Sequence, residues 1–260
     1  MAYETLQLAV DGRIAMVTLN RPKVLNALNA AMLQELNELF AELALDEDVR
    51  VVLLAGAGGK AFAAGADIAE LAEADLTSGE QLAGSAQRIF RRIETMGKPV
   101  IACIDGFALG GGCELAMACT LRLASQSARL GQPEIKLGII PGYGGTQRLP
   151  RLVGRGAALK MVLTGAIVDA EEALRIGLVD EVVPEGQLME RARELASLIA
   201  SMPPLAIQAA IEAVGRGADL PLDEALALEA SLFGQLWRTE DKREGMRAFL
   251  EKRSPVWVGR

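Results

Sequence analysis

The chain has 260 residues, of which 51% are hydrophobic and 23% are charged, and its formal net charge is −7. This length and apolar content favour one large or two unequal globular domains with a substantial core. The negative charge and the lack of a basic stripe interleaved with aromatic residues argue against nucleic acid as a partner.

Three cysteines and no histidine limit the metal and redox chemistry that the chain could perform. Cys103, Cys113 and Cys119 form no CxxC motif, and no histidine is present to complete a zinc site. We therefore expect reduced thiols, no bound metal, and Cys113 as a buried packing residue in preference to an activated thiolate. The first residues lack a signal-peptide pattern, and no run resembles a transmembrane helix, so the sequence predicts a cytoplasmic protein without a membrane partner.

The first hundred residues predict strands that alternate with helices. Two strands joined by the Asp11-Gly12 turn are followed by a helix that Asn29 caps, a buried strand and a glycine-rich loop. A short helix from Asp67 and a longer helix complete this part. The expected ranges are strands 5–10, 13–19 and 50–55, the loop 56–65 and the helix 79–96.

The pattern of strand, glycine-rich loop and helix then occurs a second time. It comprises a strand at 100–104, a loop at 105–112, a helix at 113–119 and a further short strand at 121–124. Two neighbouring units of this kind predict an α/β core with right-handed connections. Ligands bind at the loops that follow the strands in such folds.

From Gly144 onward the sequence is mostly helical. Asp169 and Glu172 resemble a capping box, and an extended segment at 177–183 interrupts the helices. The expected helices are 185–201, 204–215, 221–237 and 239–252. A shift in composition near residue 200 suggests an α/β core over 1–200 and a helical region over 201–260. Such a tail has little core of its own, so we expect it to pack on the body or on another subunit.

Two glutamates in apolar, glycine-rich surroundings are the candidate catalytic residues. Glu114 is the only charged residue between positions 106 and 121, and Glu134 follows Pro133 in a second glycine-bounded motif. A buried carboxylate is costly unless it has a partner or a role, and without histidine the carboxylates must transfer the protons. Each glutamate could instead be structural, at a helix start or in a turn. As a pair they favour the catalytic interpretation.

The two glycine-rich loops could bind phosphate or form an oxyanion hole. Residues 56–61 break the GxGxxG pattern at its last position, and no P-loop motif occurs, so nucleotide binding is weakly supported. The first loop could also be only a tight turn. Alternatively, one backbone N–H from each loop could polarise a carbonyl beside the two carboxylates. That arrangement suits proton transfer through an enolate.

Several long motifs resemble the enoyl-CoA hydratase (crotonase) family along nearly the whole chain. They are NRPKVLNALN at 20–29, KAFAAGADI at 60–68, GFALGGGCELAMA at 106–118, GQPEIKLGIIPGYGGTQRL at 131–149 and TEDKREGMRAFLEKR at 239–253. The resemblance implies an α/β fold, a crotonase-like spiral of ββα units with a helical C-terminal trimerisation region. It also implies a homohexamer made of two trimers.

The resemblance also implies roles for single residues. The N–H groups of Ala66 and Gly111 would hold the thioester oxygen, Glu114 would act on the water, and Glu134 would transfer the α-carbon proton. Surface positions remain an alternative for the three lysines in the implied substrate site. The residues implied to bind the substrate and its coenzyme A are Lys23, Lys60, Ala66, Asp67, Ile68, Gly111, Gly142 and Lys252.

The resemblance implies reversible hydration of 2-enoyl-CoA to 3-hydroxyacyl-CoA. No separate cofactor is expected, since coenzyme A is part of the acyl-CoA thioester substrate. The alternatives are a Δ3,Δ2-enoyl-CoA isomerase, which would depend mainly on Glu134, and an acyl-CoA-binding or scaffold subunit without turnover. Ala69 departs from the lysine common in hydratases. Tyr143 could narrow the acyl site, whose shape we expect to depend on residues 69–90.

Overall fold

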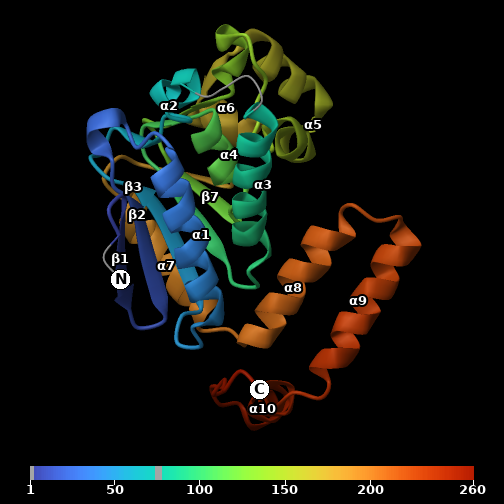
Figure 1. Ribbon diagram of the computed structural model, residues 1–260. Coiled ribbons are helices and arrows are strands. Elements are labelled where there is room, and N and C mark those ends of the chain that lie inside the picture. The colour runs from blue at the N-terminus through green and yellow to red at the C-terminus, as the bar shows by residue number, and fades with distance from the viewer. Residues whose placement is uncertain (1–2, 74–77) are drawn as a thin grey trace.

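Two β-sheets form the body of the molecule. A computed structural model of the chain describes residues 3–73 and 78–260 (Figure 1). The larger sheet has the order β1-β2-β3-β5-β7-β10, antiparallel between β1 and β2 and parallel elsewhere. Its strands are β1 (Leu6–Asp11), β2 (Ile14–Leu19), β3 (Val51–Gly56), β5 (Val100–Ile104), β7 (Leu121–Ser125) and β10 (Glu181–Val183). The smaller sheet contains β4 (Ala61–Ala63), β6 (Phe107–Leu109), β8 (Arg129–Gly131) and β9 (Ile167–Asp169).

The chain alternates between the two sheets. β3, β5 and β7 lie in the larger sheet, and the strands that follow them, β4, β6 and β8, lie in the smaller one. Within each sheet these strands are parallel, so each turn of the chain advances by one strand in both sheets. This arrangement is the spiral of ββα units that the family resemblance implies.

Helices cover both faces of the larger sheet, because alternate residues of its strands are apolar on both sides. Val52 and Leu54 belong to one buried cluster, whereas Val51 and Leu53 belong to another. Figure 1 shows α1 and α3 in front of the sheet and α7 behind it. The helices of the body are α1 (Ala30–Leu45), α2 (Ile68–Glu73), α3 (Gly79–Thr95), α4 (Gly111–Met117), α5 (Gly145–Thr164), α6 (Ala170–Arg175) and α7 (Leu188–Ala200). Two 3₁₀ helices, η1 (Pro22–Val24) and η2 (Pro133–Leu137), complete it.

The predicted helix caps are confirmed. The side chain of Asn29 accepts a hydrogen bond from Met32 N at 3.0 Å, and that of Asp169 accepts one from Glu172 N at 2.9 Å. The reciprocal half of the capping box is replaced by an ion pair between Glu172 and Arg175 at 2.5 Å.

The prediction was wrong where short strands lie inside segments expected to be loops or helices. The loops expected at 56–65 and 105–112 contain β4 and β6, and β8 and β9 had no predicted counterpart. The helix expected at 113–119 is α4, which begins at Gly111. The helix expected at 185–201 is α7, which begins at Leu188 because a turn follows Pro184. Three-residue strands are too short to show a period of two in the sequence.

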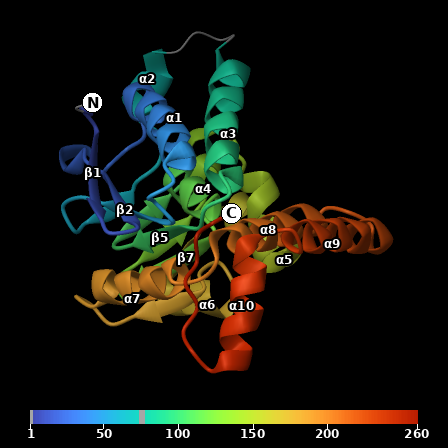
Figure 2. The ribbon, with the colours of Figure 1, turned by 90° about the horizontal axis from the view of Figure 1, so that it is seen from below.

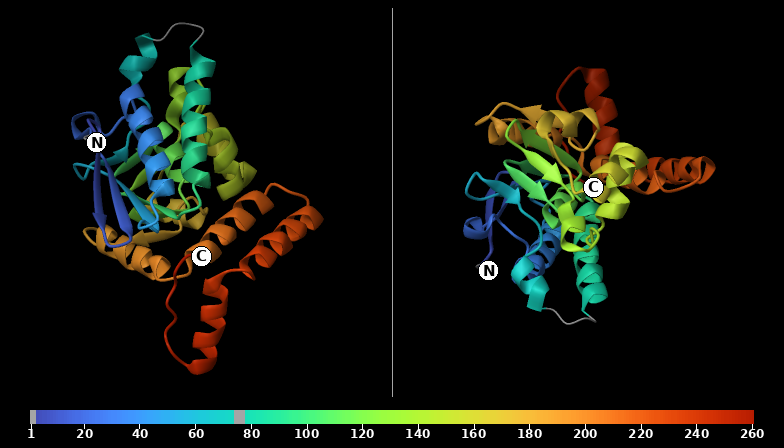
Figure 3. Two further views of the ribbon diagram at one scale, coloured as in Figure 1. Left: turned by 60° about the horizontal axis from the view of Figure 1, so that its bottom comes forward. Right: turned by 90° about the horizontal axis from the view of Figure 1, so that it is seen from above.

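Three helices follow the body: α8 (Pro204–Gly217), α9 (Leu222–Leu236) and α10 (Glu240–Glu251). Helices α8 and α9 form an antiparallel pair that projects from the body (Figures 1 and 2). Figure 3 shows the same projection from two further directions, with α10 apart from the sheets. The last residues fold back onto α10, where the carboxylate of Asp241 accepts hydrogen bonds from Val258 N at 2.7 Å and Gly259 N at 3.0 Å.

Within residues 3–73 and 78–260, no single helix is long and apolar enough to cross a membrane. Helices α7 and α8 reach that length and composition only as a pair, and they are bent by 106° relative to each other.

Candidate active site

A cavity of about 1030 Å³ lies where the ends of the smaller sheet meet α2, α3, α4 and the start of α5. Its walls are mainly apolar, with Leu71, Leu82 and Ile140 among them. Of its described lining residues, only Glu114 and Glu134 are acidic. A mainly apolar pocket with two convergent carboxylates is typical of an active site.

Glu114 lies in the first turn of α4 and is 1% exposed. The helix can approach β4 this closely because Gly112 has no side chain, and a Cβ atom there would overlap the carbonyl oxygen of Ala63. One carboxylate oxygen, Oε1, accepts hydrogen bonds from Tyr143 N at 2.8 Å and Gly145 N at 2.6 Å. Burial raises the pKa of Glu114 to about 7, although the N–H of Gly145 opposes the rise.

Glu134 lies in η2 and is 9% exposed. Burial raises the pKa of this carboxyl as well. Gln132 is 0% exposed. With its side-chain amide nitrogen facing Glu134, that nitrogen donates to Oε1 at 3.1 Å and to Oε2 at 3.2 Å. The charge of Glu134 in turn contributes to the raised pKa of Glu114. The two carboxyls therefore interact electrostatically across the end of the cavity.

Two backbone N–H groups lie beside the carboxylates. A Cβ atom placed on Gly111 would lie 3.4 Å from Ala66 N, so the two peptide groups are neighbours. Both residues line the cavity. In the part of the chain that the structure describes, neither Ala66 N nor Gly111 N donates a backbone hydrogen bond. Two adjacent free donors at a cavity wall can bind an oxygen that becomes negatively charged.

The other residues predicted to bind substrate divide into two groups. Ile68 and Gly142 line the cavity. Lys23 and Lys60 are exposed and lie outside its lining. Lys252 follows α10, at the opposite end of the molecule from α2 (Figure 1), so within one chain it does not reach this cavity.

The carboxylate of Asp67 contacts another side chain of the protein and does not face the cavity. It pairs with Arg21 at 3.0 Å, and Arg21 also donates to the carbonyl oxygen of Ala27. This contact ties η1 to the segment that carries Ala66. Asp67 therefore supports the cavity wall without lining it.

Tyr143 both lines the cavity and packs in the core. Its ring makes an edge-to-face contact with Phe90, with the ring centroids 5.9 Å apart. A Cβ atom on Gly111 would lie 3.0 Å from this ring, so the tyrosine adjoins one of the two free N–H groups. Ala69 is exposed and lies outside the lining. Residues 74–77 of the segment expected to shape the acyl site lie outside the described residues.

The cysteines contribute no reactive thiol. Cys113 is fully buried, and burial raises its pKa to about 12. The expectation of a packing residue agrees with this environment. Among the described residues no group of three or more acidic, cysteine or histidine side chains is arranged to hold a metal ion.

Comparison with known proteins decides the family. The sequence profile of the enoyl-CoA hydratase/isomerase family matches residues 10–260. The chain belongs to the enoyl-CoA hydratase/isomerase family. It is 48% identical to the short-chain-enoyl-CoA hydratase of Clostridium acetobutylicum over 253 residues, which is 97% of each chain. It is 44% identical to the crotonyl-CoA hydratase of Syntrophomonas wolfei over 260 residues, the full length of both.

Solved structures of hydratases confirm the crotonase-like fold. The enoyl-CoA hydratase of Bacillus anthracis superposes with a TM-score of 0.96 at 40% identity, covering 99% of this chain and 100% of that one. A hydratase subunit from Geobacillus kaustophilus gives a TM-score of 0.94 at 42% identity and covers 99% of both chains. Membership of the enoyl-CoA hydratase/isomerase family and its spiral of ββα units, both expected from the motifs, are thus confirmed.

Sequence reasoning missed several polar groups around the two glutamates of this family member. Gln132 stands two positions before Glu134, and its place between Gly131 and Pro133 in the same motif is the only local signal that could have singled it out. The structure buries it completely. Arg148 and Glu94 form an ion pair at 3.1 Å behind the loop of residues 143–145, whose N–H groups bind Glu114. They are 54 residues apart, and no local pattern connects them.

Proposed function

We propose that this protein reversibly hydrates 2-enoyl-CoA thioesters to 3-hydroxyacyl-CoA in the cavity that Glu114 and Glu134 share. The observation that carries the proposal is the meeting of two buried carboxyls with two free, adjacent N–H groups at one cavity wall. The names of the two relatives, a short-chain and a crotonyl hydratase, make a short enoyl chain the first substrate to test.

The backbone donors would bind the thioester carbonyl. The oxygen of an enoyl thioester gains negative charge as its β-carbon is attacked and an enolate develops. Ala66 N and Gly111 N would stabilise that charge, and such donors are worth about 100-fold or more in rate. Because these donors are backbone groups, they require no metal. Coenzyme A enters as part of the substrate, and the reaction needs no redox cofactor.

The carboxyl pair would move the protons. Two interacting carboxyls whose pKa values are both raised by burial favour states in which the pair holds one proton. In the proposed reactive state this proton is on Glu134 and Glu114 is ionised. As the water oxygen bonds to the β-carbon, one water proton passes to ionised Glu114. Protonated Glu134 gives its proton to the α-carbon. The pair then again holds one proton, so the net change is the addition of one water molecule.

The test follows the loss of the conjugated enoyl-thioester absorbance when crotonyl-CoA is mixed with the wild-type protein, Glu114→Gln or Glu134→Gln. We expect rapid loss in the wild type and a fall in kcat of about 100-fold or more in each variant. A 3-enoyl thioester is assayed in parallel. Isomerisation that survives Glu114→Gln, without hydration in the wild type, would replace this proposal by the isomerase. Tight binding without any product would replace it by the binding subunit.

The helical region over 201–260 is proposed to join subunits into a homohexamer, a dimer of trimers. Its helices carry large apolar side chains in solvent, including Leu222 at 71%, Phe233 at 62%, Trp237 at 53%, Phe249 at 84% and Leu250 at 80% exposure. Apolar surface of this kind on a projecting helix pair is typical of a subunit interface. Sedimentation of the purified protein measures the assembly size directly.

A further inference from the structure

Behind the loop that holds Glu114, an ion pair joins two helices. Arg148, in α5, donates from Nε to Glu94 Oε1 at 3.3 Å and from Nη2 to Glu94 Oε2 at 3.1 Å. Glu94, near the end of α3, also accepts from Arg91 at 2.8 Å. Burial opposes the ionisation of Glu94, but the hydrogen bonds from the two arginines outweigh it, so the pKa of this carboxyl is lowered. The pair is therefore charged at neutral pH.

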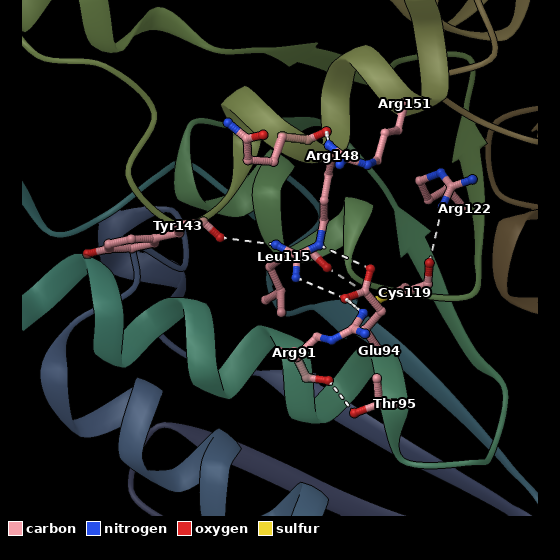
Figure 4. A network of polar contacts seen from close by, with 10 residues as sticks. Arg91, Glu94, Thr95, Leu115, Cys119, Arg122, Tyr143, Arg148 and Arg151 are labelled. Carbon is pink, nitrogen blue, oxygen red and sulfur yellow. Dashed lines mark hydrogen bonds and ion pairs between the residues drawn. The ribbon is translucent and has the colours of Figure 1, made fainter. Parts of the chain in front are cut away.

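The remaining nitrogen of the guanidinium reaches the loop itself. Arg148 Nη1 donates to the carbonyl oxygen of Tyr143 at 3.2 Å. Figure 4 shows the side chain of Arg148 extended between this carbonyl and the carboxylate of Glu94. Nη1 also lies against Gly144, where a Cβ atom would overlap it, and Gly144 has a φ of +114°. Glycine at position 144 thus lets the loop lie directly against the arginine.

The same loop supplies both hydrogen bonds to Glu114. The N–H groups of Tyr143 and Gly145 flank Gly144 and converge on Oε1 of Glu114. Side chains of Arg148 and Glu94 do not line the cavity, so neither is placed to touch a substrate. We propose that Arg148, fixed by Glu94, is a positioning residue that holds the Tyr143–Gly145 loop so that its two N–H groups aim the carboxylate of Glu114. The kinetic part of this inference rests on the proposed hydration.

A positioning role of the ion pair and a purely electrostatic role predict opposite shifts of the Glu114 pKa in one variant. Glu94→Gln removes a negative charge behind the loop and leaves Arg148 in place. Through-space electrostatics alone would then stabilise ionised Glu114 and lower its pKa. Loss of the anchor would instead loosen the two N–H bonds and raise that pKa. The titratable groups that face Glu114 are Glu134, Arg148, Tyr143 and Cys113, and this variant changes none of them.

The first measurement needs no substrate. Amide hydrogen exchange of the segment around Tyr143 and Gly145 is followed in the full-length wild type, Glu94→Gln and Arg148→Gln. We expect about 10-fold or faster exchange in both variants, because opening of the loop is no longer opposed by the ion pair. Arg151→Gln is the matched control. Arg151 lies on the same helix and pairs with its own carboxylate, Asp219, at 3.0 Å.

The second measurement is kinetic. For Glu94→Gln and Arg148→Gln we expect kcat to fall by about 10- to 100-fold with KM nearly unchanged, since small misplacement of a catalytic group has this effect. The acid limb of the kcat profile should move to higher pH. Arg148→Lys keeps the charge but not the planar fork, and we expect it to resemble Arg148→Gln more than the wild type.

The two measurements have separate consequences. Unchanged loop exchange in both variants would overturn the positioning role, as would an acid limb that moves to lower pH in Glu94→Gln. A lower melting temperature with unaltered kcat and pH profile would reduce the pair to a structural contact and overturn the inference as well. If the wild type hydrates no enoyl thioester, the proposed function fails, while the exchange measurement still decides whether the ion pair holds the loop.

Discussion

Replacing Glu114 by glutamine should stabilise the protein relative to the wild type, and this stabilisation should increase as the pH rises. Glu114 is 1% exposed and receives two backbone hydrogen bonds on one oxygen. These bonds do not fully replace the water that an ionised carboxylate loses on burial. Glutamine offers an oxygen to the same two N–H groups without carrying a charge. The variant therefore removes a penalty that exists only when the carboxyl is ionised.

The magnitude follows from the pKa. A rise from 4.5 to about 7 corresponds to about 3 kcal/mol, at about 1.4 kcal/mol for each pH unit. Between these two pH values the folded protein holds a proton on Glu114 that the unfolded chain has lost. Stability of the wild type therefore falls as the pH rises through this window, and the penalty is complete above pH 7. Below pH 4.5 both states are protonated, and the penalty vanishes.

Thermal unfolding of the two proteins from about pH 4.5 to about pH 8 measures this difference, with matched protein concentration and ionic strength. For a chain of this size, about 3 kcal/mol corresponds to roughly 6–12 °C in melting temperature. The melting temperature of the variant minus that of the wild type should rise by this amount across the range. Titration of groups that do not interact with Glu114 is common to both proteins and largely cancels. Glu185→Gln, at an exposed turn before α7, is the control that should stay parallel to the wild type.

Parallel curves for Glu114→Gln and the wild type would refute the reasoning, because they would mean that Glu114 titrates alike in the folded and unfolded states. A difference that falls with rising pH would refute it more strongly. That result would show a carboxylate stabilised by its hydrogen bonds rather than destabilised by burial.

Three further outcomes are expected. Gly110→Ala should lower kcat by about 100-fold or more, because its Cβ would lie 2.6 Å from Glu134 Oε1 and the backbone φ is +49°; an unchanged initial rate with crotonyl-CoA would contradict this. Iodoacetamide at about pH 8 should leave Cys113 unmodified in the native protein, because burial raises the pKa of this thiol to about 12, and mass spectrometry of the intact chain detects any adduct. Phe249→Glu should shift the protein to smaller assemblies in sedimentation, because Phe249 is 84% exposed in the single chain; an unaltered mass would remove this residue from the interface.

The larger elements of the fold could be predicted because their hydrophobic patterns are long or uniform. The strand at 100–104 is apolar at every position and is buried throughout. Helix α1 shows its buried face at helical spacing and begins at a recognisable cap. The smaller sheet could not be predicted in this way. Its strands have three residues each and lie among glycines, so that pairing with neighbours far along the chain, and not local pattern, defines them.

A residue of the candidate site could be predicted where a charged side chain lies within a short apolar segment. Glu114 stands alone among apolar residues, and the cost of burying it marked the position before any contact was known. Arg148 gave no such signal, because an arginine after a helix start is common at a protein surface. Its role depends on Glu94, whose position opposite the loop is set by how α3 packs over the sheet. Such long-range pairs are determined by tertiary structure and are invisible in a local sequence pattern.

The most direct test of the central claim is the product formed from crotonyl-CoA in D₂O. The wild-type protein is incubated with the thioester, and the product is analysed by mass spectrometry and by NMR after return to ordinary water. Proton transfer by Glu134 to the α-carbon, coupled to addition of water, predicts 3-hydroxybutyryl-CoA with one deuterium bound to the α-carbon. Recovery of unlabelled crotonyl-CoA under conditions in which the thioester binds would contradict hydration at this site.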